Sequence, residues 1–262
     1  MQESIEIYSG DNRETILAIH AKPTGHVQLE RVQALVIMAH DFPGSQDSHN
    51  DFFGDLEFLF TNLGYHTLRF DFRGCGQSQG QESDFLFSTA LEDFQAVLQW
   101  SKNQGFKNLI FVGEGLGASI CLSHVAEAPA PVLCSLLFWP ALDLRSLAAE
   151  RFSDNANQDQ RIFSWGYDIN HSLVEELQKS DMGTVLSNVK HPLLVQIGSE
   201  DKVVSPDHLE FLKQHSKAPR IDITSYQKGN YGLTDNKHRK MIFFHAGQFI
   251  ERYGPQPEAI GL

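Results

Sequence analysis

Residues 108–118 read Asn-Leu-Ile-Phe-Val-Gly-Glu-Gly-Leu-Gly-Ala. Residues 109–112 form a short apolar run, which is typical of a strand covered on both faces. Glycines then alternate with Glu114 and Leu116, and a helical pattern starts at Ala118. Glycine permits the tight backbone turn that such a change of direction needs. The stretch therefore predicts a strand, a sharp turn and a helix in direct succession.

Strand-like and helix-like runs alternate on both sides of this stretch. The expected strands are 4–9, 15–22, 34–40, 66–72, 108–112, 132–139, 192–198 and 220–224. The expected helices are 53–62, 88–102, 118–126, 207–214 and 237–252. This alternation indicates βαβ units and a mostly parallel sheet with helices on both faces. Between about 143 and 189 the chain turns polar, which predicts a small cap insertion in a single α/β domain spanning residues 1–262.

The composition indicates an ordinary soluble globular protein. Of the 262 residues, 41% are hydrophobic and 21% are charged, and the formal net charge is -12. This charge disfavours nucleic acid and anionic membranes as partners. The N-terminus lacks the basic and apolar segments of a signal peptide, and no apolar run approaches the roughly 20 residues of a membrane span. Three unpatterned cysteines argue against a disulfide framework, so we expect a cytoplasmic protein.

Four loop motifs follow one another in a recognisable order. They are His-Asp-Phe-Pro-Gly-Ser at 40–45, Arg-Phe-Asp-Phe-Arg-Gly-Cys-Gly-Gln-Ser at 69–78, Gly-Glu-Gly-Leu-Gly at 113–117 and Gly-Ser-Glu-Asp-Lys-Val-Val-Ser at 198–205. Taken in the same order, these four motifs resemble four segments of α/β-hydrolases: the oxyanion loop, the R-x-D-x-x-G-x-G-x-S segment, the G-x-S-x-G nucleophile elbow and the loop that carries the triad acid. From about residue 34 onward the chain is similar to this family, most closely to small cinnamoyl- or feruloyl-esterase-like carboxylesterases.

The resemblance implies an α/β-hydrolase fold and gives single residues their expected roles. Asp201 stands where the triad acid belongs. Gly115 occupies the position of the nucleophilic serine, and Tyr231 that of the triad histidine. The residues expected to line the oxyanion hole and the ligand pocket are His40, Asp41, Phe42, Glu114 and Leu116.

Two of the three triad positions therefore lack the usual residue. Gly115 has no side chain to attack a carbonyl carbon. Tyrosine, with a reference pKa of about 10, is protonated at neutral pH and is a poor general base. Loss of a triad serine or histidine costs about a millionfold in turnover. The separate change at Tyr231 favours natural loss of the triad over an engineered change at Gly115. Without its two partners, Asp201 is expected to act as a turn-former that caps nearby amides.

Residues 113–118 also match the dinucleotide-binding fingerprint G-x-G-x-x-A, with Gly113, Gly115 and Ala118 at its fixed positions. Against this interpretation, more than a hundred residues precede the motif, and the next strand ends in Phe138-Trp139-Pro140 rather than in an acidic ribose-binding residue. We therefore predict no cofactor. Metal binding finds no support either, because the twelve histidines are scattered and form no H-E-x-x-H or Cys/His cluster.

Other side chains near the elbow offer weak replacements for the triad. Cys75 has no evident histidine partner, so an idle thiol is expected. Asp41 and Glu114 make the pocket mouth acidic, and although paired carboxylates can transfer protons, acids at loop ends are usually exposed. The predicted pocket beneath the cap has a floor of Phe42, Gly115, Leu116 and Tyr231, with Phe163 or Trp165 above.

Three hypotheses for function remain open. The first is a non-catalytic hydrolase homologue that binds a small, partly apolar or ester-like ligand or a protein partner. The second is a carboxylesterase-like hydrolase with diverged or residual activity carried by Asp201, Cys75 or Glu114. The third is a structural role in a homo-oligomer with a large apolar interface. The triad changes favour the first hypothesis.

Overall fold

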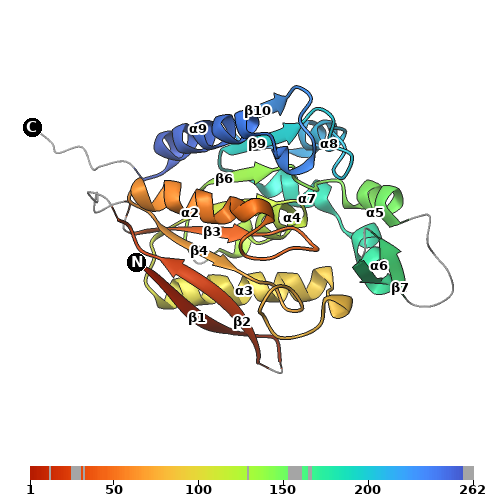
Figure 1. The fold of residues 1–262 in the computed structure, drawn as a ribbon, viewed down its shortest axis with the longest axis horizontal. Helices are drawn as coiled ribbons and strands as arrows, with labels where there is room; N and C mark the ends of the chain where they lie inside the picture. Colours follow the sequence, from red (N-terminus) through yellow and green to blue (C-terminus); the bar gives the residue numbers. More distant parts are fainter. Residues whose placement is uncertain are drawn as a thin grey trace, which may run out of the picture.

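The computed structural model describes residues 1–11, 13–24, 31, 33–128, 130–152, 161–164 and 167–255. Its centre is an eight-stranded sheet with the order β1-β2-β4-β3-β5-β6-β9-β10 (Figure 1). β2 is antiparallel to both of its neighbours, and every other pair in this sheet is parallel. The prediction of an α/β fold with a mostly parallel sheet is confirmed. The strands are β1 (Gln2–Ser9), β2 (Glu14–Ala21), β3 (Ala34–Ala39), β4 (His66–Phe70), β5 (Asn108–Glu114), β6 (Val132–Phe138), β9 (Leu193–Gly198) and β10 (Ile221–Tyr226).

Helices cover both faces of the sheet, as the sequence predicts. α2 and α9 pack on one face, and α3, α4, α7 and α8 pack on the other. β3 is buried along its whole length, which explains its continuous apolar sequence. The helices are α2 (Phe52–Asn62), α3 (Phe87–Asn103), α4 (Leu116–Ser123), α5 (Leu144–Phe152), α6 (His171–Lys179), α7 (Met182–Asn188), α8 (His208–His215) and α9 (Asn236–Tyr253).

The segment predicted as a cap, 143–189, lies between β6 and β9. It contains α5, a two-stranded antiparallel sheet of β7 (Arg161–Ser164) and β8 (Tyr167–Asn170), and then α6 and α7. α5, β7 and α6 lie at the right of Figure 1, beside the main sheet, whereas α7 lies against the sheet. The sequence predicts a cap here but not its short strand pair, because four-residue strands leave little periodic signal. Among the described residues, no helix is long and apolar enough to cross a membrane.

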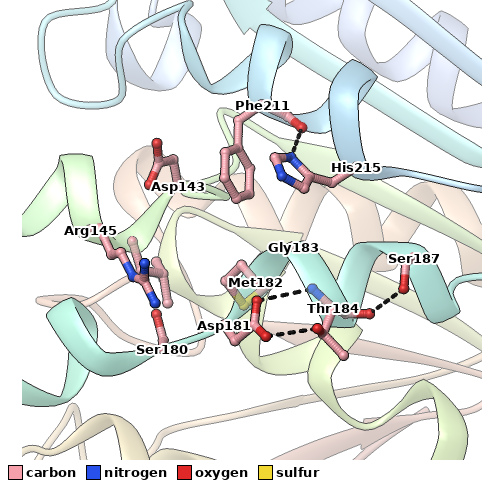
Figure 2. Close-up of a pocket in the computed structure, with 11 residues that line it drawn as sticks. Asp143, Arg145, Ser180, Asp181, Met182, Gly183, Thr184, Ser187, Phe211 and His215 are labelled. Carbon is pink, nitrogen blue, oxygen red and sulfur yellow. Dashed lines mark hydrogen bonds between the residues drawn. The ribbon is translucent and has the colours of Figure 1, made fainter.

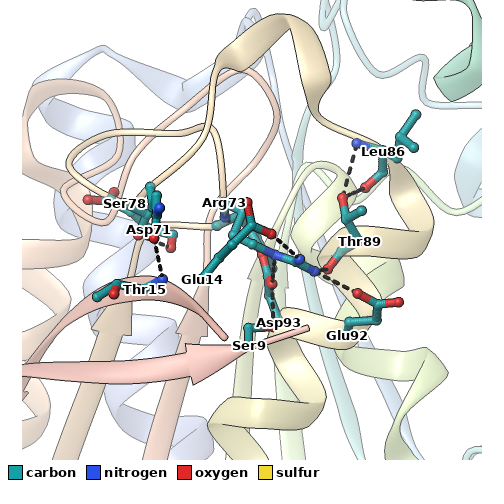
Figure 3. Close-up of polar contacts among 12 residues, drawn as sticks. Ser9, Glu14, Thr15, Asp71, Arg73, Ser78, Leu86, Thr89, Glu92 and Asp93 are labelled. Atoms are coloured by element: carbon teal, nitrogen blue, oxygen red, sulfur yellow. Dashed lines mark hydrogen bonds and ion pairs between the residues drawn. The ribbon is translucent and has the colours of Figure 1, made fainter. Parts of the chain in front are cut away.

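A partly buried arginine connects the N-terminal strand pair to α3 (Figure 3). The Arg73 guanidinium contacts Asp93 at 2.5 Å, Glu92 at 2.7 Å and Glu14 at 2.8 Å. Ser9, the last residue of β1, donates a hydrogen bond to the same Asp93 carboxylate at 2.7 Å. β1, β2 and α3 are therefore joined through a single cation with three carboxylates around it.

Candidate functional site

The site is organised by the turn between β5 and α4. Gly115 has φ 52° and ψ -121°, a backbone conformation that side chains rarely adopt. The flanking glycines are needed for close packing, because a Cβ at Gly113 would overlap the backbone of Ala118 and one at Gly117 would overlap the carbonyl oxygen of Ala39. The predicted strand, sharp turn and helix are therefore present, although the helix starts two residues earlier than predicted.

The space where a side chain at Gly115 would project is filled by Asp41, from the loop after β3. A Cβ built on Gly115 would overlap the Asp41 carboxylate. Asp41 Oδ1 accepts a hydrogen bond from the backbone N–H of Leu116 at 2.7 Å, and Oδ2 accepts one from the Tyr231 hydroxyl. The side chain is buried, with 4% exposure. In an elbow of this kind the amide after the nucleophile serves the oxyanion hole, so a carboxylate of the chain itself holds that amide here.

Glu114 is the second buried acid of the site, with 4% exposure. It accepts hydrogen bonds from Ser48 Oγ at 2.6 Å, Trp139 Nε1 at 3.1 Å and His49 Nδ1 at 3.2 Å. The expectation that Asp41 and Glu114 are exposed at a pocket mouth is wrong. Both carboxylates point inward because donors from separate loops compensate for their loss of water.

His49 joins the elbow to the loop that carries Tyr231. Its Nδ1 faces Glu114, and its Nε2 lies 2.9 Å from the carbonyl oxygen of Gly232. Because both partners are acceptors, this environment favours the doubly protonated imidazolium form of the ring. Burial lowers the pKa of His49, but the hydrogen bonds to Glu114 and Gly232 and the Glu114 charge outweigh burial, so the pKa lies above its usual value.

His40 holds the oxyanion loop, as the resemblance implies. Its Nε2 accepts a hydrogen bond from Phe72 N–H at 3.2 Å, so the proton sits on Nδ1, which donates to the Asp41 carbonyl oxygen at 2.6 Å. Burial holds the pKa of His40 below its usual value and keeps the ring neutral. Phe42 is buried and stacks on Phe85, with ring centroids 3.9 Å apart.

Asp201 lies in the loop after β9. Its Oδ1 accepts hydrogen bonds from the backbone N–H groups of Val203 at 2.8 Å and Val204 at 2.9 Å. This is the geometry of a residue that caps its own turn. Tyr231 begins the short helix η5 (Tyr231–Leu233), is half-buried, and directs its hydroxyl to Asp41.

The predicted pocket floor is a packed region. Phe42 and Leu116 are buried, and Asp41 fills the space above Gly115. Gly115, Asp41 and Tyr231 line none of five cavities found among the described residues. Of the predicted cap aromatics, Phe163 lies in β7, opposite Asp168, and Trp165 lies outside the described residues.

A cavity of ≈ 400 Å³ lies instead between the start of α5, the α6–α7 connection and α8 (Figure 2). Arg145, Asp181, Phe211 and His215 are among its lining residues. His215 Nδ1 is 2.9 Å from the Phe211 carbonyl oxygen, which holds this ring in place. On the other side of the same connection is a second cavity of ≈ 360 Å³, lined by apolar side chains that include Met182.

The other nucleophile and ligand candidates are poorly placed for chemistry. Cys75 is buried, and burial raises the pKa of its thiol, so it lacks the thiolate that a nucleophile needs. Ser119 is buried within α4 and donates to the Ala141 carbonyl oxygen. The Leu116 amide, which a bound pyrophosphate would contact in a dinucleotide site, already holds Asp41. Within the described ranges, no three His, Cys, Asp or Glu side chains are grouped to hold a metal ion.

A family model described as "Serine aminopeptidase, S33" matches residues 30–171, which is more than half of the chain. The chain belongs to this family of α/β-hydrolases. The part of the chain that matches the S33 family model contains the loop at 40–45 and the elbow at 113–117, whereas Asp201 and Tyr231 lie outside it. A weaker match, 29% identical over 82 residues, is to an uncharacterised 31.7 kDa protein of Escherichia coli in the traX-finO intergenic region. The chain spans 26% of the length of that relative.

Esterases are among the solved structures that share this fold. Est1E from Butyrivibrio proteoclasticus, solved with ferulic acid, has a TM-score of 0.82 at 17% identity, covering 94% of this chain and 98% of that one. Esterase Pf2001 from Pyrococcus furiosus has a TM-score of 0.73 at 18% identity, covering 97% of this chain and 93% of that one. Mouse α/β hydrolase domain-containing protein 10 has a TM-score of 0.76 at 15% identity, covering 95% of this chain and 99% of that one. This S33 member therefore has an α/β-hydrolase fold with esterase-like neighbours.

Sequence reasoning missed three residues of this α/β-hydrolase site. Ser48, His49 and Trp139 all contact Glu114, but they come from two different loops. Each is an unremarkable residue in its own segment, so no local pattern reveals it. The available signal was Glu114 itself, because a carboxylate inside a glycine turn between buried elements needs several donors.

Proposed function

We propose that this chain is a non-catalytic α/β-hydrolase homologue whose former catalytic centre is closed by Asp41. One observation carries the proposal. The Asp41 carboxylate occupies the side-chain space of Gly115 and accepts the N–H of Leu116, the amide that an ester carbonyl would need. A substrate therefore finds no nucleophile and no free donor at that amide.

The changes at this centre support one another. Asp41 fits because Gly115 has no side chain, and Tyr231 supplies a donor to Asp41 where a histidine would serve as the base. Glu114 in turn holds His49 against the Tyr231 loop. A site with a single inactivating change would keep the remaining groups directed at a substrate, whereas here they are directed at one another.

In place of hydrolysis we assign the chain a binding role, with a small, partly apolar ligand or a protein partner. The ≈ 400 Å³ cavity beside α8 has the size of a small-molecule site and can be filled without displacing Asp41. A screen of small esters and carboxylic acids by thermal shift tests this role. Stabilisation should be lost in Arg145→Glu and kept in Arg220→Glu, because Arg220 is exposed and does not line this cavity.

The experiment that tests the loss of catalysis measures hydrolysis of short-chain p-nitrophenyl and methyl hydroxycinnamate esters. The parent should stay at background. Gly115→Ser/Tyr231→His should also stay low, since Asp41 still occupies the elbow. Adding Asp41→Gly to that pair should raise turnover by orders of magnitude, because the missing groups account for about a millionfold. The matched control, Asp41→Gly/Tyr231→His, lacks only the nucleophile and should remain silent.

The opposite result is equally clear. If the purified parent hydrolyses these esters above background, and the activity survives repurification and is lost in Asp41→Asn, the chain is an enzyme with a relocated catalytic group. The non-catalytic proposal is then wrong.

A further inference from the structure

Two histidines meet on the sheet far from the elbow. His20 is on β2, and His66 is the first residue of β4, the neighbouring strand. His20 Nε2 and His66 Nδ1 are 2.9 Å apart, and the rings are within 16° of parallel. Since each neutral ring has one N–H, one nitrogen donates and the other accepts. The two nitrogens thus face each other across one shared proton.

Aromatic side chains hold both rings in this orientation. Trp100, near the end of α3, meets His20 edge-on with centroids 5.4 Å apart, and Phe106, just beyond α3, meets His66 in the same way at 5.2 Å. A cavity of ≈ 310 Å³ opens beside the pair and is lined by both histidines. The pair is therefore both fixed and reachable from solvent.

The charge state of the pair suits a metal ion. Burial lowers the pKa of His66 to about 4, with further lowering by His20 and Lys22, and burial also lowers the pKa of His20. Both rings are thus neutral at pH 7, the form that coordinates metals. In a tetrahedral zinc site with Zn–N bonds of about 2.0–2.1 Å, two nitrogens lie roughly 3.3 Å apart. From the present 2.9 Å separation, the nitrogens must move apart by a few tenths of an ångström, and the rings must turn so that both lone pairs face the ion.

A carboxylate is available on the same face. Glu3 on β1 is the direct cross-strand partner of His20, and residues paired in this way have neighbouring side chains. Its carboxylate now contacts Lys22 Nζ at 3.6 Å. Glu3 and Glu57 attract a cation to His20, and Lys22 opposes it. The two imidazoles are the protein ligands and water completes the coordination, while the Glu3 carboxylate adds negative charge beside the site.

We propose that His20 and His66 form a binding site for a borderline divalent cation, Zn²⁺ or Ni²⁺, that bridges β2 and β4. On binding, the proton between the rings moves to the outer nitrogen of its own imidazole, so both lone pairs meet the metal and no proton is released. The ion links the N-terminal strand pair to the body of the sheet.

The test is calorimetric titration of the chelator-stripped full chain with ZnCl₂ and NiCl₂ at pH 7.5, together with thermal unfolding. The parent should bind one equivalent. At about ten times Kd, linkage predicts a rise in Tm of about 3–6 °C for a chain of this size. Both effects should vanish in His66→Ala. They should persist in His171→Ala, which removes an exposed histidine paired with Glu175 on α6.

A gain-of-binding variant keeps the test decisive if His66→Ala folds poorly. Lys22→Ala removes the opposing charge and releases Glu3. It should bind Zn²⁺ up to about tenfold more tightly, from the Coulomb energy of one unit charge about 6 Å from a dication in water. No binding by the parent, binding that survives His66→Ala, or weaker binding by Lys22→Ala each overturns the proposal.

Discussion

Adding one carbon at Gly115 should destabilise this protein strongly unless Asp41 is removed with it. A side chain at φ 52° is strained by about 1–3 kcal/mol. The Cβ also displaces the Asp41 carboxylate from Leu116 N–H and Tyr231 Oη, and one lost charge-assisted hydrogen bond costs about 1.5–3 kcal/mol. Gly115→Ala should therefore lower the free energy of unfolding by about 2.5–6 kcal/mol, or Tm by about 5–24 °C.

In an Asp41→Gly background only the strain remains, so the same substitution should cost about 1–3 kcal/mol. The double-mutant cycle then has a coupling free energy of about 1.5–3 kcal/mol, measured by urea unfolding with constant m values. Gly105→Ala is the matched control, because Gly105 has φ 81° and nothing lies within 4 Å of its added Cβ. Effects at Gly115 and Asp41 that add within about 0.5 kcal/mol would refute the idea that the two residues share one space.

Three further predictions concern charged groups. His49 has a raised pKa, so the stability from its charged form is complete below about pH 6.5 and is lost as pH rises through that pKa. The stability difference between the parent and His49→Asn should therefore shrink from pH 6 to pH 9 in denaturant titrations, and a constant difference would count against the imidazolium. Burial lowers the pKa of His208 to about 4, so its contribution of about 3 kcal/mol is present above about pH 6.5 and is lost as pH falls toward 4. His208→Asn should flatten this acid limb of the stability curve, and an unchanged slope would be evidence against a neutral buried ring. Asp41→Gly frees the donors on Leu116 and Tyr231, so acetate should raise the Tm of this variant more than that of the parent, whereas uncharged acetamide should not.

The fold was predictable because its signals are local. The buried strands are short apolar runs, and the elbow is a strand followed by glycines, so most element ends agree within two residues. β5 extends to Glu114 and α4 begins at Leu116, which places Gly115 alone at the turn. The strands β7 and β8 escaped prediction because four residues are too few to show a period.

The site was predictable in its positions and not in its contacts. Motif order placed Asp41, Gly115 and Tyr231 in one region, but the sequence carries no information on which way Asp41 turns. That direction depends on the empty space at Gly115 and on a hydroxyl from a loop late in the chain. Burial of Glu114 likewise depends on donors brought in by tertiary packing. Long-range hydrogen bonds of this kind leave no periodic signature.

The arginine anchor at Arg73 has a consequence for self-association. β2 covers the outer edge of β4, a five-residue strand whose last four residues are buried. Without the N-terminal strand pair, β4 would present unpaired N–H and C=O groups on an apolar strand, which is a template for aggregation between chains. By holding Glu14 on β2 and Asp93 on α3, Arg73 keeps that edge covered. We therefore expect loss of this ion-pair cluster to favour edge-to-edge pairing between chains as well as to loosen two elements of the fold.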